Sequence, residues 1–142
     1  HLLNRSLARA QHAAEALSGV NPNCTLHAGP LSPESFRQIA NCTDIVVNCL
    51  AAGAEQAVES MPIEELPAHA VWADINYWMP LPPQMEACRK HGLRFSDGLG
   101  MLVHQGVQSF EWFVGKPVPV HEVFHAIAAT KTALDPKPPK VR

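Results

Sequence analysis

A glycine-rich turn that opens an apolar helix is the segment of this chain best suited to hold a flat ring. Residues 97–105 read Asp-Gly-Leu-Gly-Met-Leu-Val-His-Gln, with two glycines within three residues of the aspartate. Glycine lets the backbone bend tightly and lets a ring approach it closely. The helix that follows carries amide side chains, Gln105 among them, on a different face from its apolar stripe. An ordinary buried helix with a glycine-rich entry is the alternative, because Gly-x-Gly alone is weakly diagnostic.

Two arginines near the start of the chain lie where an anion would be expected to bind. Residues 1–3 indicate the end of a strand, so Arg5 lies at its carboxyl end and Arg9 lies one turn into the next helix. In a doubly wound fold this position meets the adenosine ribose. An acid there binds the 2′-hydroxyl, whereas an arginine accommodates a 2′-phosphate. The sequence offers two forked donors here and no acid. Solvated arginines at a helix start are the alternative.

His121, Glu122 and His125 formally match the zinc pattern His-Glu-x-x-His. A catalytic zinc needs a third protein ligand, and after His125 the only candidate is Asp135, in a proline-rich segment. We therefore interpret this segment as a solvated amphipathic helix and predict no metal site.

Alternating strand and helix patterns predict how these side chains are positioned. Residues 44–49 are apolar and β-branched without alternation, which is typical of a strand buried on both faces of a parallel sheet. Further strands are predicted at 1–3, 24–27, 70–75 and 93–95, with helices between them. This rhythm predicts an α/β fold, a doubly wound Rossmann-like parallel sheet followed by C-terminal helices. Because the sequence starts without Met inside a strand pattern, we expect an N-terminal part to be missing.

Capping residues set the expected helix boundaries. Ser6 is the expected N-cap of the first helix, and Ser32 caps a second helix that begins with Pro33. Later helices are predicted over 84–91 and 121–131. In the helix after residue 98, the expected apolar stripe consists of Leu99, Leu102 or Val103, Gly106, Phe110 and Phe113.

Composition restricts the class of protein. The 142 residues are 46% hydrophobic and 17% charged, which predicts a globular domain over 1–131. Its proline-rich end predicts a disordered tail over 132–142. The net charge of −2 gives no electrostatic footprint for nucleic acid or an anionic membrane. No apolar run reaches the ~18 residues of a membrane span, and we expect a cytoplasmic protein.

The cysteines lack the spacing of a disulfide framework or a redox motif. No Cys-x-x-Cys occurs, and the chain is not small and cysteine-dense. We therefore expect reduced thiols packed in the core. The four positions are Cys24, Cys42, Cys49 and Cys88.

Three ordered segments resemble shikimate dehydrogenases. The nine residues from Asp97 to Gln105 closely resemble the signature near the C-terminal end of that family. Asn-Arg-Ser-x-x-Arg at residues 4–9 resembles the Asn-Arg-Thr-x-x-Arg segment of the family, with a hydroxyl kept at Ser6. Asp74 and Tyr77 match a third family pattern, Asp-x-x-Tyr. The resemblance extends from Asn4 to about Ile127 and implies the NADP-binding, C-terminal part of a shikimate dehydrogenase or a close relative, a family that reduces 3-dehydroshikimate with NADPH.

The resemblance also implies roles for individual residues. The adenosine phosphate of NADP is expected at Asn4, Arg5, Ser6 and Arg9. The rest of the cofactor and its nicotinamide are expected at Asn48, Ile75, Gly98 and Met101. Tyr77 and Gln105 are expected to approach the substrate, shikimate or a related polyol acid. A homodimer is compatible with the resemblance.

Several positions depart from the family pattern. Leu50 and Ala51 replace residues that usually carry hydroxyls, and Trp78 and Met79 change the loop after Tyr77. The catalytic Lys and Asp of the family belong to an N-terminal substrate domain. No lysine of this chain lies in such a motif, so we expect the chain alone to be inactive. A non-catalytic relative that binds a nucleotide or a partner is the competing hypothesis.

Overall fold

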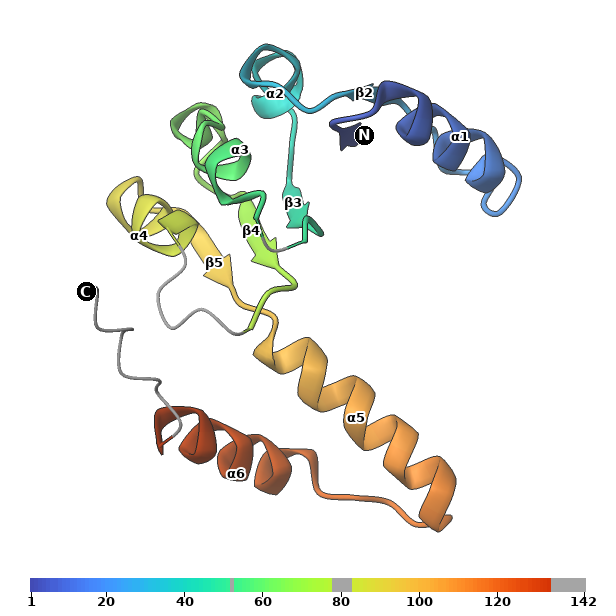
Figure 1. Ribbon diagram of the computed structural model, residues 1–142, viewed down its shortest axis with the longest axis vertical. Helices are drawn as coiled ribbons and strands as arrows, with labels where there is room; N and C mark the ends of the chain where they lie inside the picture. The colour runs from blue at the N-terminus through green and yellow to red at the C-terminus, as the bar shows by residue number, and fades with distance from the viewer. Residues whose placement is uncertain (52, 78–82, 134–142) are drawn as a thin grey trace, which may run out of the picture.

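The computed structural model of the chain describes residues 1–51, 53–77 and 83–133 (Figure 1). Strands and helices alternate along the first two thirds, and two long helices follow. The described strands form two parallel sheets. One has the order β1-β2, and the other has the order β3-β4-β5. The predicted α/β class with parallel strands and C-terminal helices is confirmed.

The strands are short and lie close to their predicted positions in four of five cases. Their bounds are β1 Leu2–Asn4, β2 Ala28–Pro30, β3 Ile45–Asn48, β4 Val71–Asp74 and β5 Arg94–Ser96. The prediction of a strand over 24–27 was wrong, because the strand begins at Ala28, one residue after the predicted segment ends. Hydrogen bonds to β1 fix it there, since Leu2 N–H donates to the His27 carbonyl and Leu31 N–H donates to the Asn4 carbonyl. Pairing with a neighbour, more than local propensity, decides which residues form a strand.

The helices between the strands lie beside the sheets, and the last two helices extend away from them (Figure 1). Their bounds are α1 Leu7–Leu17, α2 Pro33–Ala40, α3 Glu55–Glu59, α4 Pro83–Lys90, α5 Leu99–Val114 and α6 Val120–Ala133, with a 3₁₀ turn, η1, at Ile63–Glu65. Ser32 caps α2 as predicted, because its hydroxyl accepts the Ser35 N–H at 3.2 Å. Ser6 occupies the N-cap of α1 without a side-chain capping bond. Most of the predicted tail, residues 134–142, lies outside the described residues.

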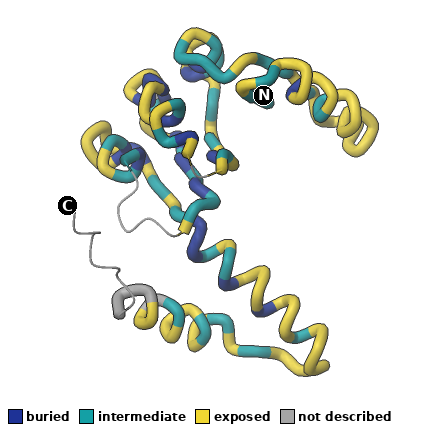
Figure 2. The backbone as a smooth tube through the Cα atoms, viewed as in Figure 1, coloured by how far each residue is buried: buried dark blue, intermediate teal, exposed yellow. Residues whose placement is uncertain are grey.

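The main core lies between β3, β4 and the helices that cover them (Figure 2). Phe36 of α2 and Trp72 of β4 are at its centre, with ring centroids 6.3 Å apart. Leu3 of β1 and Val46 of β3 pack against the same cluster. The two sheets therefore share one core, although no strand pairing joins them among the described residues.

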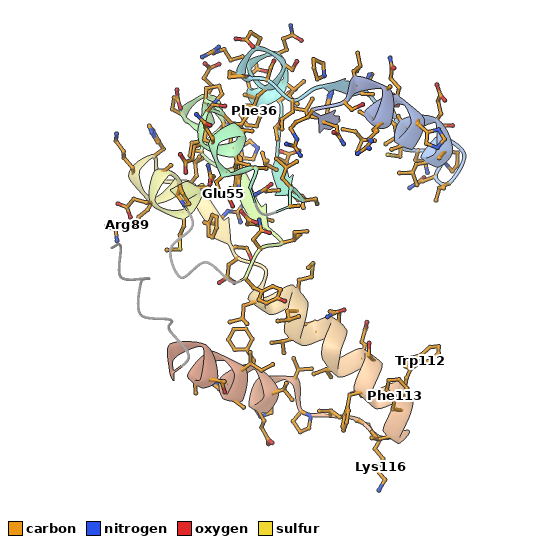
Figure 3. The ribbon with its side chains drawn as sticks, viewed as in Figure 1. Phe36, Glu55, Arg89, Trp112, Phe113 and Lys116 are labelled. Atoms are coloured by element: carbon orange, nitrogen blue, oxygen red, sulfur yellow. The ribbon has the colours of Figure 1, made fainter. Side chains whose placement is uncertain are left out.

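A second, smaller core joins α5 to α6, and it corrects the predicted stripe. The buried residues of α5 are Leu99, Val103 and Val107, which pack against α6. Phe110 is 55% exposed and Phe113 is 89% exposed (Figure 3). The spacing of four residues along 99, 103 and 107 defines the buried line. Phe110 lies on the same side of the helix as this line, but both aromatic residues are near the C-terminal end of α5, where they stay exposed.

The four cysteines are free, as predicted, but Cys88 alone is buried in the core. Cys24, Cys42 and Cys49 are exposed, so the predicted core location is wrong for these three. Within the described ranges, no helix combines the length and apolar character needed to cross a membrane.

Candidate functional site

The carboxyl ends of β3 and β4 meet in a buried pair of polar side chains. Asn48 ends β3, and its amide donates a 2.8 Å hydrogen bond to the carboxylate of Asp74 at the end of β4. Both residues are less than 10% exposed. Each side chain also fixes the turn that follows its strand. Asn48 Oδ1 accepts the Leu50 N–H, and Asp74 Oδ1 accepts the Asn76 N–H. The pair sets the course of both loops at the end of the sheet where parallel folds bind ligands.

Gly98 brings the start of α5 against the end of β4. Its N–H donates to the Asn76 carbonyl at 3.1 Å, while Ile75 N–H donates to the Asn48 carbonyl at 3.1 Å. A Cβ at position 98 would lie 2.0 Å from the Ile75 carbonyl oxygen, so only glycine fits. A Cβ at Gly100 would meet no atom within 4 Å. Of the two predicted glycines, Gly98 alone makes a close backbone approach, and it forms the narrow step between β4 and α5.

The predicted anion site lies at the junction of β1 and α1. Asn4 Oδ1 accepts the Ser6 N–H at 3.1 Å, which shapes the turn between strand and helix. Arg5 and Arg9 are exposed, and no ion pair is recorded for either among the described residues. The first turn of α1 contains no acidic residue. Two free guanidinium groups at a helix N-terminus form a site that favours an anion.

One cleft brings part of this set together. A cleft of about 650 Å³ has Asn4 and Arg9 in one wall and Asn48 and Leu50 in the other. Asn4, Arg9 and Asn48 of the predicted set thus face a common space, whereas Arg5 and Ser6 do not line it. Neither this cleft nor the small cavity beside Asp74 is lined by Tyr77, Met101 or Gln105.

The remaining predicted residues lie along α5 and on the loop after β4. Met101 is 53% exposed and Gln105 is exposed, and both are on faces of α5 that no described element covers. Tyr77 is 38% exposed at the last described position before residue 83. Trp78 and Met79, the predicted departures in this loop, lie outside the described residues.

Two residues of the site make hydrogen bonds that the sequence did not indicate. Asp97 fixes the start of α5, because its Oδ1 accepts the Leu99 N–H at 3.1 Å. Asp74 is the partner of Asn48, a contact between residues 26 positions apart. The local signal was a polar residue ending each of two apolar strands, which indicates side chains at the same sheet edge.

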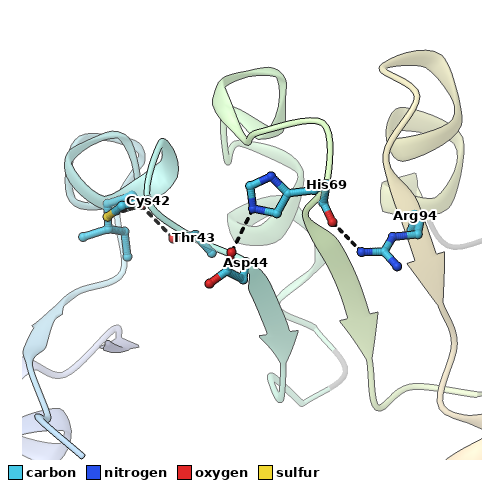
Figure 4. Close-up of polar contacts among 6 residues, drawn as sticks. Cys42, Thr43, Asp44, His69 and Arg94 are labelled. Carbon is cyan, nitrogen blue, oxygen red and sulfur yellow. Dashed lines mark hydrogen bonds and ion pairs between the residues drawn. The ribbon is translucent and has the colours of Figure 1, made fainter.

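Polar contacts also join the opposite edge of the sheet, where β3, β4 and β5 begin (Figure 4). His69 Nε2 lies 2.8 Å from Asp44 Oδ1, and the Arg94 guanidinium donates to the His69 carbonyl. His69 and Asp44 are both largely exposed, so this group stabilises the register far from the candidate site.

The pKa shifts of the described residues do not indicate an acid–base centre. At the loop after β3, the Gly53 N–H donates to Glu55 at 2.9 Å and lowers the pKa of that exposed carboxyl. Burial raises the pKa of the Cys88 thiol in the core. In the part of the chain that the structure describes, no three His, Cys, Asp or Glu side chains gather as a metal site.

Comparison with known proteins gives a consistent result. Residues 98–123 match the family model of the shikimate 5'-dehydrogenase C-terminal domain. The chain is 32% identical over 127 residues to the shikimate dehydrogenase (NADP(+)) of Magnetococcus marinus, covering 89% of this chain and 44% of that protein. It is 39% identical over 124 residues to the enzyme of the same name from Symbiobacterium thermophilum, covering 84% and 42%.

A solved structure supports the fold. Shikimate 5-dehydrogenase from Listeria monocytogenes, in complex with shikimate and NAD, superposes with a TM-score of 0.74 at 20% identity. The match covers 88% of this chain and 45% of the other. The chain therefore spans less than half the length of the relatives it matches. Its nine-residue signature lies largely within the matched family model, and on these grounds the chain belongs to the shikimate dehydrogenase family, whose C-terminal part it matches.

Proposed function

We propose that this chain is the NADP-binding, C-terminal part of a shikimate dehydrogenase that reduces 3-dehydroshikimate to shikimate. The observation that carries the proposal is the presence of two exposed arginines, Arg5 and Arg9, at the acid-free start of α1, where Arg9 lines the cleft. An arginine at this position accommodates the 2′-phosphate that distinguishes NADP from NAD. The names of the relatives from Magnetococcus marinus and Symbiobacterium thermophilum include NADP(+).

The other residues of the site suit the remaining parts of the cofactor. Bound NADPH would supply the hydride for reduction of the keto group. Asn48 and Asp74 hold the two loops that would line it, and Gly98 keeps the α5 backbone close to Ile75. Met101, one turn into α5, would contact the nicotinamide from the exposed side of the helix. Tyr77 and Gln105 would bind the substrate, with the Gln105 amide donating to or accepting from a hydroxyl.

Cofactor preference tests the proposal. The protein for this test is a chimera in which the N-terminal part of the Magnetococcus marinus relative is joined to this chain. The added part supplies the region of the relative that this chain does not match. We expect it to bind NADP more tightly than NAD and to reduce 3-dehydroshikimate. The Arg5→Ala/Arg9→Ala variant should lose the preference, since each charge-assisted contact is worth about 1.5–3 kcal/mol. A loss of 1.4 kcal/mol is tenfold in affinity.

A matched variant controls for general charge loss. Arg89 is an exposed arginine on α4, and its nearest recorded partner is Glu86 at 3.7 Å. Arg89→Ala should leave the ratio of NADP to NAD affinity unchanged. An unchanged ratio in the Arg5/Arg9 double variant would refute the anion site. Binding of NADP without turnover would favour a nucleotide-binding relative over the enzyme.

A further inference from the structure

We propose that Asp74 is a positioning residue for hydride transfer, which holds the backbone beside the nicotinamide site and contacts neither cofactor nor substrate. This role rests on the proposed function. Asp74 ends β4 and is 5% exposed. Its carboxylate accepts two hydrogen bonds of 2.8 Å, one from the side-chain amide of Asn48 to Oδ2 and one from the Asn76 N–H to Oδ1. A buried carboxylate with both oxygens in use is fixed in place and fixes the groups bonded to it.

The position of the Asp74 carboxylate excludes direct contact with a ligand. The cleft of about 650 Å³ is not lined by Asp74. The small cavity that Asp74 does line measures about 20 Å³, which is room for about one water molecule. A nicotinamide ring or a polyol acid is too large for this space. The effect of Asp74 on the reaction therefore passes through the groups that it holds.

A series of hydrogen bonds connects Asp74 to the start of α5. Asp74 accepts the Asn76 N–H, and the Asn76 carbonyl accepts the Gly98 N–H at 3.1 Å. The residue between them, Ile75, donates its N–H to the Asn48 carbonyl at 3.1 Å. The peptide groups next to Ile75 are thus held by β3, by the end of β4 and by the start of α5, which begins beside the carboxyl end of β4 (Figure 1).

The contact between Gly98 and Ile75 leaves little room for displacement. A Cβ added at position 98 would overlap the Ile75 carbonyl group, so the two backbones already touch. A shift of the Asn76 peptide must therefore move the Gly98 backbone with it. A misplacement of about 1 Å can cost about a hundredfold in rate, even when its cause is remote from the chemistry. Because the nicotinamide is expected beside Ile75 and Gly98, displacing this loop would slow hydride transfer.

The adenosine phosphate of the cofactor is expected at a different junction. Arg5 and Arg9 lie where β1 meets α1, and Asn4 shapes that turn through its bond with the Ser6 N–H. No bond of this turn involves β4 among the described residues. A change at Asp74 should therefore displace the ring end of the bound cofactor and leave the phosphate end in place. The expected signature is slower hydride transfer with little change in NADP affinity.

Asp74→Asn in the chimera tests this signature. The new amide has one acceptor oxygen for two donors, so either the Asn48 amide or the Asn76 N–H loses its partner. Reduction of the keto group adds one hydride from bound NADPH to carbon and one proton from a general acid of the N-terminal part to oxygen, and it leaves NADP⁺. With enzyme in excess, we expect the rate constant for loss of NADPH absorbance to fall by about tenfold or more. The dissociation constant of NADP should change by less than about threefold.

This single-turnover measurement separates positioning from loss of folded protein. Partial unfolding lowers the amplitude of the absorbance change and leaves its rate constant unaltered. Cys88→Ala is the matched control, because it removes a buried thiol from the main core and leaves the bonds of Asp74 in place. Its rate constant should stay within about twofold of the parent chimera.

Exchanging the two side chains separates hydrogen bonding from charge. In Asn48→Asp/Asp74→Asn, the amide at position 74 can donate to the carboxylate at position 48 and still accept the Asn76 N–H. The carboxylate at position 48 can still accept the Leu50 N–H. The exchange therefore keeps all three hydrogen bonds, and we expect it to restore the rate constant to within about threefold of the parent. A carboxylate that acted on the substrate directly could not be moved in this way.

Hydrogen exchange in the chain alone supplies a readout that needs neither cofactor nor activity. In Asp74→Asn, the Asn76 and Gly98 amides should exchange about tenfold faster or more, because both lie on the bonded path from Asp74. The Leu31 and Gly115 amides donate to carbonyls in other parts of the chain and should exchange as in the parent. Asp74→Ser, whose hydroxyl can still accept the Asn76 N–H, should act in the same direction and replaces Asp74→Asn if that variant does not fold.

Three results would overturn the proposal. The first is an unchanged single-turnover rate constant in Asp74→Asn. The second is a folded Asn48→Asp/Asp74→Asn variant that is as slow as Asp74→Asn. The third is unchanged exchange of the Asn76 and Gly98 amides. A parent chimera that neither binds NADP nor oxidises NADPH would refute the proposed function instead, and the exchange rates would still decide whether Asp74 holds the backbone from Ile75 to Gly98.

Discussion

The side-chain amide of Asn48 donates a 2.8 Å hydrogen bond to Oδ2 of Asp74, and this contact ties the ends of β3 and β4 together. Both residues are buried, and Oδ1 of each accepts a backbone N–H from the loop after its own strand. A hydrogen bond between two side chains at this position sets the spacing of two loops at once. The carboxyl edge of the sheet is therefore held by side chains as well as by backbone pairing.

Removing the amide from this pair should destabilise the chain. In Asn48→Ala, a carboxylate oxygen of Asp74 stays buried without its partner, which costs about 1–3 kcal/mol. Urea denaturation of the two proteins measures the difference in the free energy of unfolding. Asp74→Asn should also destabilise the chain, because an amide at position 74 has one acceptor oxygen for the two donors that the carboxylate accepts, the Asn48 amide and the Asn76 N–H.

A contact at the opposite edge is the control for this prediction. His69→Ala removes the contact of 2.8 Å with Asp44, but both side chains are more than 60% exposed. Exposed pairs contribute at most about 1 kcal/mol. If His69→Ala destabilises the chain as much as Asn48→Ala does, the Asn48–Asp74 pair has no special part in holding the sheet.

Replacing each of the two glycines at the start of α5 by alanine should change the stability of the chain in opposite directions. Gly98→Ala places a Cβ against the Ile75 carbonyl, so the helix or the loop must shift, at a cost of about 1–3 kcal/mol or more. Gly100→Ala meets open space inside a helix, where alanine is favoured over glycine by about 0.5–1 kcal/mol. Thermal unfolding monitored by circular dichroism gives both signs. Equal effects of the two substitutions would contradict the close approach at Gly98.

The buried thiol should be distinguishable from the exposed ones by its reactivity. Burial raises the pKa of Cys88, so at pH 8 its reactive thiolate is scarce in the folded chain. With Ellman's reagent we expect three thiols, those of Cys24, Cys42 and Cys49, to react quickly. The fourth should react only on addition of denaturant. The late reaction should be absent in Cys88→Ala, and four fast equivalents in the folded protein would contradict the burial.

The raised pKa also predicts how stability depends on pH. The folded state holds the Cys88 proton to higher pH than the unfolded state does. Its contribution to stability is therefore fully present below the ordinary thiol pKa of about 8.5 and is lost as the pH rises further. Urea midpoints measured from pH 7.5 to 10 should fall more steeply for the parent chain than for Cys88→Ala.

Local patterns predicted most of the fold. The uniform run at 44–49 identified β3, and the serine and proline at 32 and 33 identified the start of α2, because such signals depend on nearby residues. The strand at Ala28–Pro30 was missed since its residues have weak β propensity and pair only with β1. The buried line of α5 was misread because apolar residues occur on several faces, and the position of α6 decides which are covered.

The arrangement of the site required the structure. Asn48 and Asp74 are 26 positions apart, and their contact depends on the register of two parallel strands. The division of the described strands into the sheets β1-β2 and β3-β4-β5 likewise depends on strand pairing, which composition and periodicity do not specify. The approach of a ring to Gly98 stays a prediction, whereas the structure shows the close contact of Gly98 with the Ile75 backbone.

Gln105 should matter for substrate far more than for cofactor or stability. It lies exposed on α5, one turn beyond Met101, and its backbone carbonyl accepts a hydrogen bond from the Ser109 hydroxyl. In the chimera, Gln105→Ala would remove one or two hydrogen bonds to substrate hydroxyls, each worth about 0.5–1.5 kcal/mol. We therefore expect kcat/KM for shikimate to fall roughly ten- to a hundredfold.

The same variant separates a substrate contact from a structural role. NADP affinity should stay within about twofold and the melting temperature should change little, because no buried volume is lost. Gln108→Ala, at another exposed amide of α5, is the matched control and should leave all three quantities unchanged. If Gln105→Ala lowers the melting temperature by several degrees while kcat/KM holds, the side chain stabilises α5 and does not bind the substrate.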